Sequence, residues 1–69
     1  MVEEHLAMAD RHVEEGIRHV EQQQALIAAL AHDGHDVTAP RALLTQFEEL
    51  LQLHIADRDR LRTELAQAG

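Results

Sequence analysis

Residues 33–40 are the only stretch of the chain in which residues that end a helix and residues that begin one occur together. Gly34 can adopt the left-handed conformation that closes a preceding helix, and Asp36 or Thr38 can cap a following one. Pro40 fits a first helical turn, where its missing N–H costs little. The stretch therefore predicts that the chain folds back on itself once.

The rest of the chain has the residue pattern of helices, so we expect an all-α fold, an antiparallel helical hairpin. The predicted helices cover residues 2–32 and 39–66, joined by a turn over 33–38, within a single domain of residues 1–69. A domain of 69 residues buries a modest fraction of its surface, and Phe47 is its only aromatic residue. Its core must be efficient or shared with another chain.

Composition and charge exclude several classes of function. The chain has no cysteine, which excludes disulfides, thiolate chemistry and cysteine-based zinc sites. No segment is apolar for long enough to cross a bilayer, and residues 1–6, with two glutamates and a histidine, do not resemble a signal peptide. We therefore expect a cytoplasmic protein that does not bind membranes.

The net charge is −7, and eight of the 13 acidic residues but only two of the six arginines lie in residues 1–36. An acidic surface without a basic stripe or an aromatic platform repels phosphate backbones, so nucleic acid is not an expected partner. An acidic helix that mimics nucleic acid, and so inhibits a basic protein, remains an alternative.

In residues 2–32, apolar or small residues recur at alternating spacings of three and four, which is typical of a helix that packs along one seam. Heptad positions a are Leu6, Val13, Val20 and Ile27, and positions d are Val2, Ala9, Gly16, Gln23 and Leu30. Glycine costs about 1 kcal/mol relative to alanine inside a helix. The place of Gly16 on the seam therefore predicts a close approach by another helix.

The second predicted helix has a wider apolar stripe. Its centre line is Phe47, His54 and Leu61, flanked by Leu43 and Leu50 on one side and by Leu44, Leu51 and Leu65 on the other. One antiparallel neighbour covers only a narrow seam, so two apolar flanks predict contacts with more than one helix. We expect two hairpins to form a homodimer, or a larger oligomer, built as a four-helix bundle. Near its end, Arg58, Arg60 and Arg62 are expected to lie alongside Asp10, Glu14 and Glu15.

Histidines are the residues that invite a chemical hypothesis. His5, His12 and His19 recur every seven residues, about 10.5 Å apart on a helix, so no two of them can bind one ion within a chain. If the turn centres near residues 36–37, facing residue numbers add to about 73 and His54 lies opposite His19. Glu15, His19 and His54 are then a candidate metal site, and two copies could bind a transition metal or haem. The alternative is that these histidines are packed, hydrogen-bonded side chains without a ligand.

Several short motifs, spread over most of the chain, carry a resemblance to other sequences. They are residues 9–13 (Ala-Asp-Arg-His-Val), Glu15 with Gly16, residues 33–36 (Asp-Gly-His-Asp), residues 43–48 (Leu-Leu-Thr-Gln-Phe-Glu) and residues 54–61. In these the chain resembles a group of small bacterial helical-hairpin proteins with a His-rich first helix. The resemblance implies a helical hairpin and carries no activity.

No catalytic motif is present, and the Glu-x-x-His pattern of di-iron bundles is missing, because Ala9, Gly16 and Leu51 stand three residues before His12, His19 and His54. The sequence therefore favours a non-enzymatic protein–protein interaction or regulatory module that binds itself and an unknown protein partner. The alternatives are a metal- or haem-binding bundle that uses His19 and His54, and the acidic mimic of nucleic acid.

Overall fold

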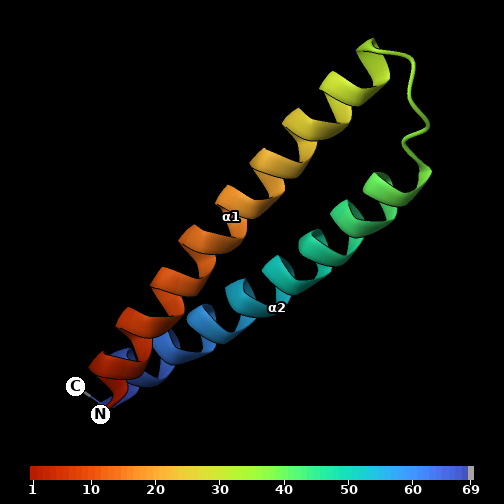
Figure 1. Cartoon of the computed structure of the whole chain (residues 1–69). Coiled ribbons are helices and arrows are strands. Elements are labelled where there is room, and N and C mark those ends of the chain that lie inside the picture. Colours follow the sequence, from red (N-terminus) through yellow and green to blue (C-terminus); the bar gives the residue numbers. More distant parts are fainter. Residues whose placement is uncertain (69) are drawn as a thin grey trace.

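The computed structural model describes residues 1–68, which form an antiparallel hairpin of two helices (Figure 1). Helix α1 spans Val2–His32 and helix α2 spans Thr38–Ala68, so the connecting loop is residues 33–37. The Cα atoms extend over 55 × 14 × 13 Å, and the start of α1 and the end of α2 lie at the same end of this rod (Figure 1). The predicted all-α hairpin is confirmed.

The predicted bounds of α1 match the structure, whereas those of α2 need a small correction. Helix α2 begins at Thr38 rather than at residue 39, and it continues through Ala68 rather than ending at residue 66. Asp36 explains the early start: its Oδ1 accepts hydrogen bonds from the backbone N–H of Thr38 at 2.9 Å and from the Thr38 hydroxyl at 2.7 Å. Asp36 thereby stabilises the first turn of α2.

Gly34 ends α1 as its sequence position predicts. It has a φ of +79°, in the left-handed region. The N–H of Gly34 donates to the carbonyl of Ala31, and the N–H of His35 donates to the carbonyl of Leu30. This pair of bonds is a Schellman motif, which satisfies carbonyls that the end of a helix would otherwise leave unpaired.

The contact between the helices follows the predicted seam of α1. All nine a and d positions of α1 are buried or half-buried, and the most enclosed apolar residues of the hairpin are Ala9, Val13 and Leu61. No side chain among residues 1–68 is completely enclosed. A single hairpin thus has a very small core, because two helices can bury only the strip along which they touch.

Two contacts fix how α1 and α2 approach. A Cβ atom added to Gly16 would lie 3.0 Å from Cδ1 of Leu51, so the absence of a side chain brings the helices together, as predicted. Near the loop, the buried side-chain amide of Gln23 donates to the backbone carbonyl of Pro40 at 2.9 Å. This bond holds the first turn of α2 against α1.

The predicted register of the hairpin is wrong by one heptad. The ring of His54 lies beside that of His12, with centroids 5.1 Å apart, and the ring of His19 lies beside Phe47 at 5.7 Å. Facing residue numbers thus add to about 66 rather than 73. The cause is the loop, which runs back along the hairpin from the end of α1 to the start of α2 (Figure 1). An extended residue advances about 3.3 Å against 1.5 Å for a helical one, so a short returning loop displaces the register by several helical residues.

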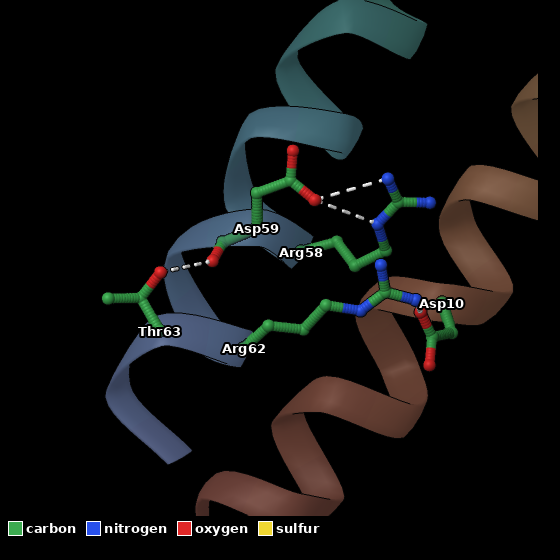
Figure 2. Close-up of polar contacts among 5 residues, drawn as sticks. All are labelled: Asp10, Arg58, Asp59, Arg62 and Thr63. Atoms are coloured by element: carbon green, nitrogen blue, oxygen red, sulfur yellow. Dashed lines mark hydrogen bonds and ion pairs between the residues drawn. The ribbon is translucent and has the colours of Figure 1, made fainter. Parts of the chain in front are cut away.

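The hairpin has one charged pair between its helices and several within α2. Arg62 reaches from α2 to Asp10 of α1, with Nη2 and Oδ1 3.5 Å apart (Figure 2). Arg58 instead forms hydrogen bonds with Asp59 on its own helix (Figure 2). Arg60 likewise pairs within α2. Of the predicted contacts between the arginines of α2 and the acidic residues of α1, the structure thus contains the one between Asp10 and Arg62.

Candidate interaction surface

The side of the hairpin opposite the Asp10–Arg62 pair carries most of the exposed large hydrophobic residues, and the heptad positions show why. In an antiparallel pair of helices, the e positions of both chains lie along one side of the seam and the g positions along the other, with the c positions next to g. With Phe47, His54 and Leu61 of α2 at position d, Asp10 and Arg62 are both at e. Their ion pair shows that the e positions of the two helices lie on the same side. Six of the seven large hydrophobic residues that are exposed lie at g or c, and only Ile17 lies at e.

We define the apolar face by the five of these six that lie within the helices. They are Met8 (52% exposed), Leu26 (48%), Leu43 (40%), Leu50 (49%) and Leu53 (67%). Met8 and Leu26 come from α1 and the other three from α2, so the face spans both helices. The sequence predicted that the two apolar flanks of α2 contact more than one helix. Within one hairpin, α1 partly covers the flank of Leu44, Leu51 and Leu65 and leaves Leu43 and Leu50 exposed.

Two adjoining pockets on this face confirm that g and c residues from both helices share one side. The larger has a volume of about 170 Å³ and the smaller about 80 Å³. The larger is lined by His5, Met8, Ala9, His12, Asp57, Arg60 and Leu61, and the smaller by His12, Glu15, Gly16, His19, Phe47, Leu50, Leu51 and His54. Both are smaller than the roughly 300–1,000 Å³ typical of pockets for organic ligands, so a single hairpin does not enclose a haem.

The predicted metal-site residues share the smaller pocket but do not form a cluster. Glu15, His19 and His54 all line it, yet the ring of His54 lies beside His12 and that of His19 beside Phe47. Within residues 1–68, no group of three or more histidine and acidic side chains is arranged to hold a metal ion. His12 lies where the sequence interpretation placed His19, because the predicted register was wrong by one heptad.

The arginine on the apolar face, Arg60, is paired with two acidic residues of its own helix. Arg60 donates to Asp57 at 2.6 Å and to Glu64 at 2.8 Å. The hydrogen bond that Asp57 accepts from Arg60, helped by the charge of Glu64, raises the pKa of Arg60 above its ordinary value. The arginine is therefore held by its own helix, and the four leucines and Met8 are the part of the face whose burial by a partner would be favourable.

Sequence reasoning missed two members of the face, Met8 and Leu53. Both lie at position c, outside the a and d seam and beyond the flanking g positions. The available signal was that these two c positions carry large apolar residues on the same side as Leu26, Leu43 and Leu50. The pattern of each helix considered separately does not show this. The shared side becomes apparent only when the two helices are placed together in the hairpin.

Comparisons of the chain with protein-family models, with curated proteins and with solved structures gave no match. Neither helix, within the described residues, combines the length and the apolar character needed to cross a membrane.

Proposed function

We propose that this protein is a non-enzymatic interaction module that acts as a homodimer, in which the apolar faces of two hairpins pack together into a four-helix bundle. The observation that carries the proposal is the gathering of Met8, Leu26, Leu43, Leu50 and Leu53 on one side of an otherwise polar hairpin. Exposed apolar residues gathered on one side of a protein, with polar residues around them, are typical of interaction sites. A second copy is the natural partner, because a two-fold axis places the same apolar face on both sides of the contact.

The energetics support self-association. Full burial of a leucine or methionine side chain contributes about 1.5–3 kcal/mol, and these residues are about half exposed. Burial of both faces in a dimer therefore contributes on the order of 10 kcal/mol, which is comparable to the whole stability of a small domain. The hairpin alone has only three buried apolar residues, Ala9, Val13 and Leu61, so the dimer would supply most of the core.

Opposite faces then have separate roles. The apolar face is covered by the second copy, and the side that carries Asp10 and Arg62 stays in solvent together with the acidic outer positions of α1. That acidic surface is available to a further protein partner, through which a small bundle of this kind would regulate another protein. We place this activity in the cytoplasm, in keeping with the resemblance to small bacterial helical-hairpin proteins.

Sedimentation equilibrium tests the proposal directly. We expect a mass of twice 7.8 kDa at tens of micromolar protein, and a melting temperature that rises with protein concentration by mass action. The double variant Leu43→Glu with Leu53→Glu should shift the equilibrium to monomers. The matched control, Gln52→Glu with Ala56→Glu, adds the same charge to exposed positions of α2 outside the face and should remain dimeric. A wild-type monomer with intact helicity, or a dimer unaffected by the Leu43 and Leu53 variants, would overturn the proposal.

A further inference from the structure

The contact between His12 and His54 suggests a function that the dimer does not explain. These two residues belong to different helices, and their ring centroids lie 5.1 Å apart at an interplanar angle of 43°. No hydrogen bond within residues 1–68 engages either imidazole. Both rings therefore have nitrogen atoms free to bind a ligand.

The separation of the rings fits shared metal coordination. With Zn–N bonds of about 2.0–2.1 Å and the ring centre roughly 1 Å beyond the bonded nitrogen, two imidazoles at a tetrahedral angle have centres about 5 Å apart. The tilt between the two rings is compatible with this arrangement, because each ring can turn about its own metal–nitrogen bond. Imidazole nitrogen is a preferred ligand of zinc, copper and nickel ions.

The surroundings of the pair leave room for an ion and its remaining ligands. His12 lines both pockets of the apolar face, and His54 lines the smaller one, which has a volume of about 80 Å³. Glu15 lines the same small pocket, three residues after His12, while Asp57 lines the larger pocket, three residues after His54. No third protein side chain is already in place within the described part of the chain, so water would fill the other coordination positions.

We propose that His12 and His54 form a two-histidine site for a divalent transition-metal ion, of which zinc is the representative, and that the bound ion clamps α1 to α2. Both ligands belong to one hairpin, so the site needs no residue of a second copy, and its pockets open on the apolar face that the proposed dimer covers. It also differs from the site predicted from sequence, because His12 takes the place of His19, which lies beside Phe47 instead.

Zinc titration of the full chain, followed by calorimetry and by thermal unfolding, tests the proposal. We expect one zinc ion per chain. At a zinc concentration tenfold above the dissociation constant, the ratio of folded to unfolded protein should rise about 11-fold, which raises the melting temperature by about 5–10 °C.

Single substitutions identify the ligands. His12→Gln and His54→Gln should each remove the zinc-dependent shift, whereas the matched controls His19→Gln and His5→Gln should keep it. His12 is exposed, so its variant should fold even if His54→Gln does not. No shift in the wild type, a shift that survives His12→Gln, or one that is lost in His19→Gln would overturn the proposal.

A final comparison separates this site from the dimer. Leu43 and Leu53 line neither pocket, so the double variant Leu43→Glu with Leu53→Glu should still bind one zinc ion per chain while it is monomeric. Loss of zinc binding in the folded monomer would show that the site needs a second copy and would overturn the assignment to a single hairpin.

Discussion

Gly16 of α1 lies directly against Leu51 of α2. A Cβ atom built on Gly16 would be 3.0 Å from Cδ1, 3.6 Å from Cβ and 3.8 Å from Cα of that leucine. The nearest atom is the end of a flexible side chain, whereas the Cα belongs to the backbone of the neighbouring helix. A small addition at residue 16 can therefore be accommodated, but a large one must push the helices apart.

We expect Gly16→Ala to change the free energy of unfolding by less than about 1 kcal/mol. The gain of about 1 kcal/mol in helix propensity is offset by the rotation of the Leu51 side chain, which costs about 0.5–1.5 kcal/mol. Gly16→Leu should destabilise by about 1–3 kcal/mol, because it overfills the contact. Urea unfolding at one fixed protein concentration measures both changes. Ala28→Leu, at an exposed position of α1, is the control, and equal tolerance at the two positions would contradict the close approach.

The hydrogen bond from Gln23 to the carbonyl of Pro40 gives a second prediction. Gln23 is only 8% exposed, and its amide joins α1 to the first turn of α2 at 2.9 Å. Gln23→Ala should lower the free energy of unfolding by about 0.5–1.5 kcal/mol, the typical net contribution of such a bond. Gln24→Ala, at the exposed neighbouring position, should change it much less in the same urea experiment. A cost equal to that of Gln24→Ala would mean that the bond contributes nothing.

Asp36 gives a prediction about pH. The hydroxyl and then the backbone N–H of Thr38 lower the pKa of Asp36 below its ordinary value of 3.8. A lowered pKa in the folded state means that this carboxylate stabilises the hairpin fully above the unfolded pKa and loses that effect as the pH falls through the folded pKa. The stability advantage of the wild type over Asp36→Ala should therefore be constant near neutral pH and disappear in acid below about pH 4.

Melting temperatures measured from pH 7 to pH 2 test this prediction. Thr38→Val should reduce the same advantage, because it removes the stronger of the two hydrogen bonds. Thr45→Val is the control, since the Thr45 hydroxyl bonds to the carbonyl of Arg41 and touches no carboxylate. An advantage over Asp36→Ala that is unchanged at pH 2 would exclude a capping role for the ionised side chain.

The residue pattern predicted the helices and their caps well because each depends on local chemistry. Gly34 ends α1 and Asp36 stabilises the start of α2 through contacts with residues close to them in the sequence. The alternation of apolar residues from Val2 to Leu30 fits only one assignment of helical faces. The register could not be obtained in this way. When one helix is shifted by one heptad, its a and d positions again face the a and d positions of the other helix. The sequence pattern therefore fits equally well whether His54 faces His19 or His12. The geometry of five loop residues decided between them, and with it the identity of the histidine pair.

The ion pair between Asp10 and Arg62 should contribute little. Its side chains are 44% and 56% exposed, and the closest nitrogen–oxygen distance is 3.5 Å, so water and salt screen the attraction. A double-mutant cycle with Asp10→Asn and Arg62→Gln should give a coupling of less than about 1 kcal/mol, smaller still in 1 M salt. A coupling well above that value would show that this pair, rather than apolar packing, sets the register.

The register itself can be tested with an engineered disulfide. Cβ atoms at residues 16 and 51 would be 3.6 Å apart, within the range of about 3.5–4.5 Å that disulfides require. The chain has no cysteine of its own, so Gly16→Cys with Leu51→Cys introduces the only two thiols. They should oxidise within one chain and raise the free energy of unfolding by about 3–4 kcal/mol, the value expected for closing a loop of this length. The control, Gly16→Cys with Arg58→Cys, places the second thiol one heptad further along α2, about 10.5 Å away. Non-reducing electrophoresis and thiol titration distinguish the outcomes, and efficient closure within one chain by the control pair instead of the 16–51 pair would restore the register that the sequence alone suggested.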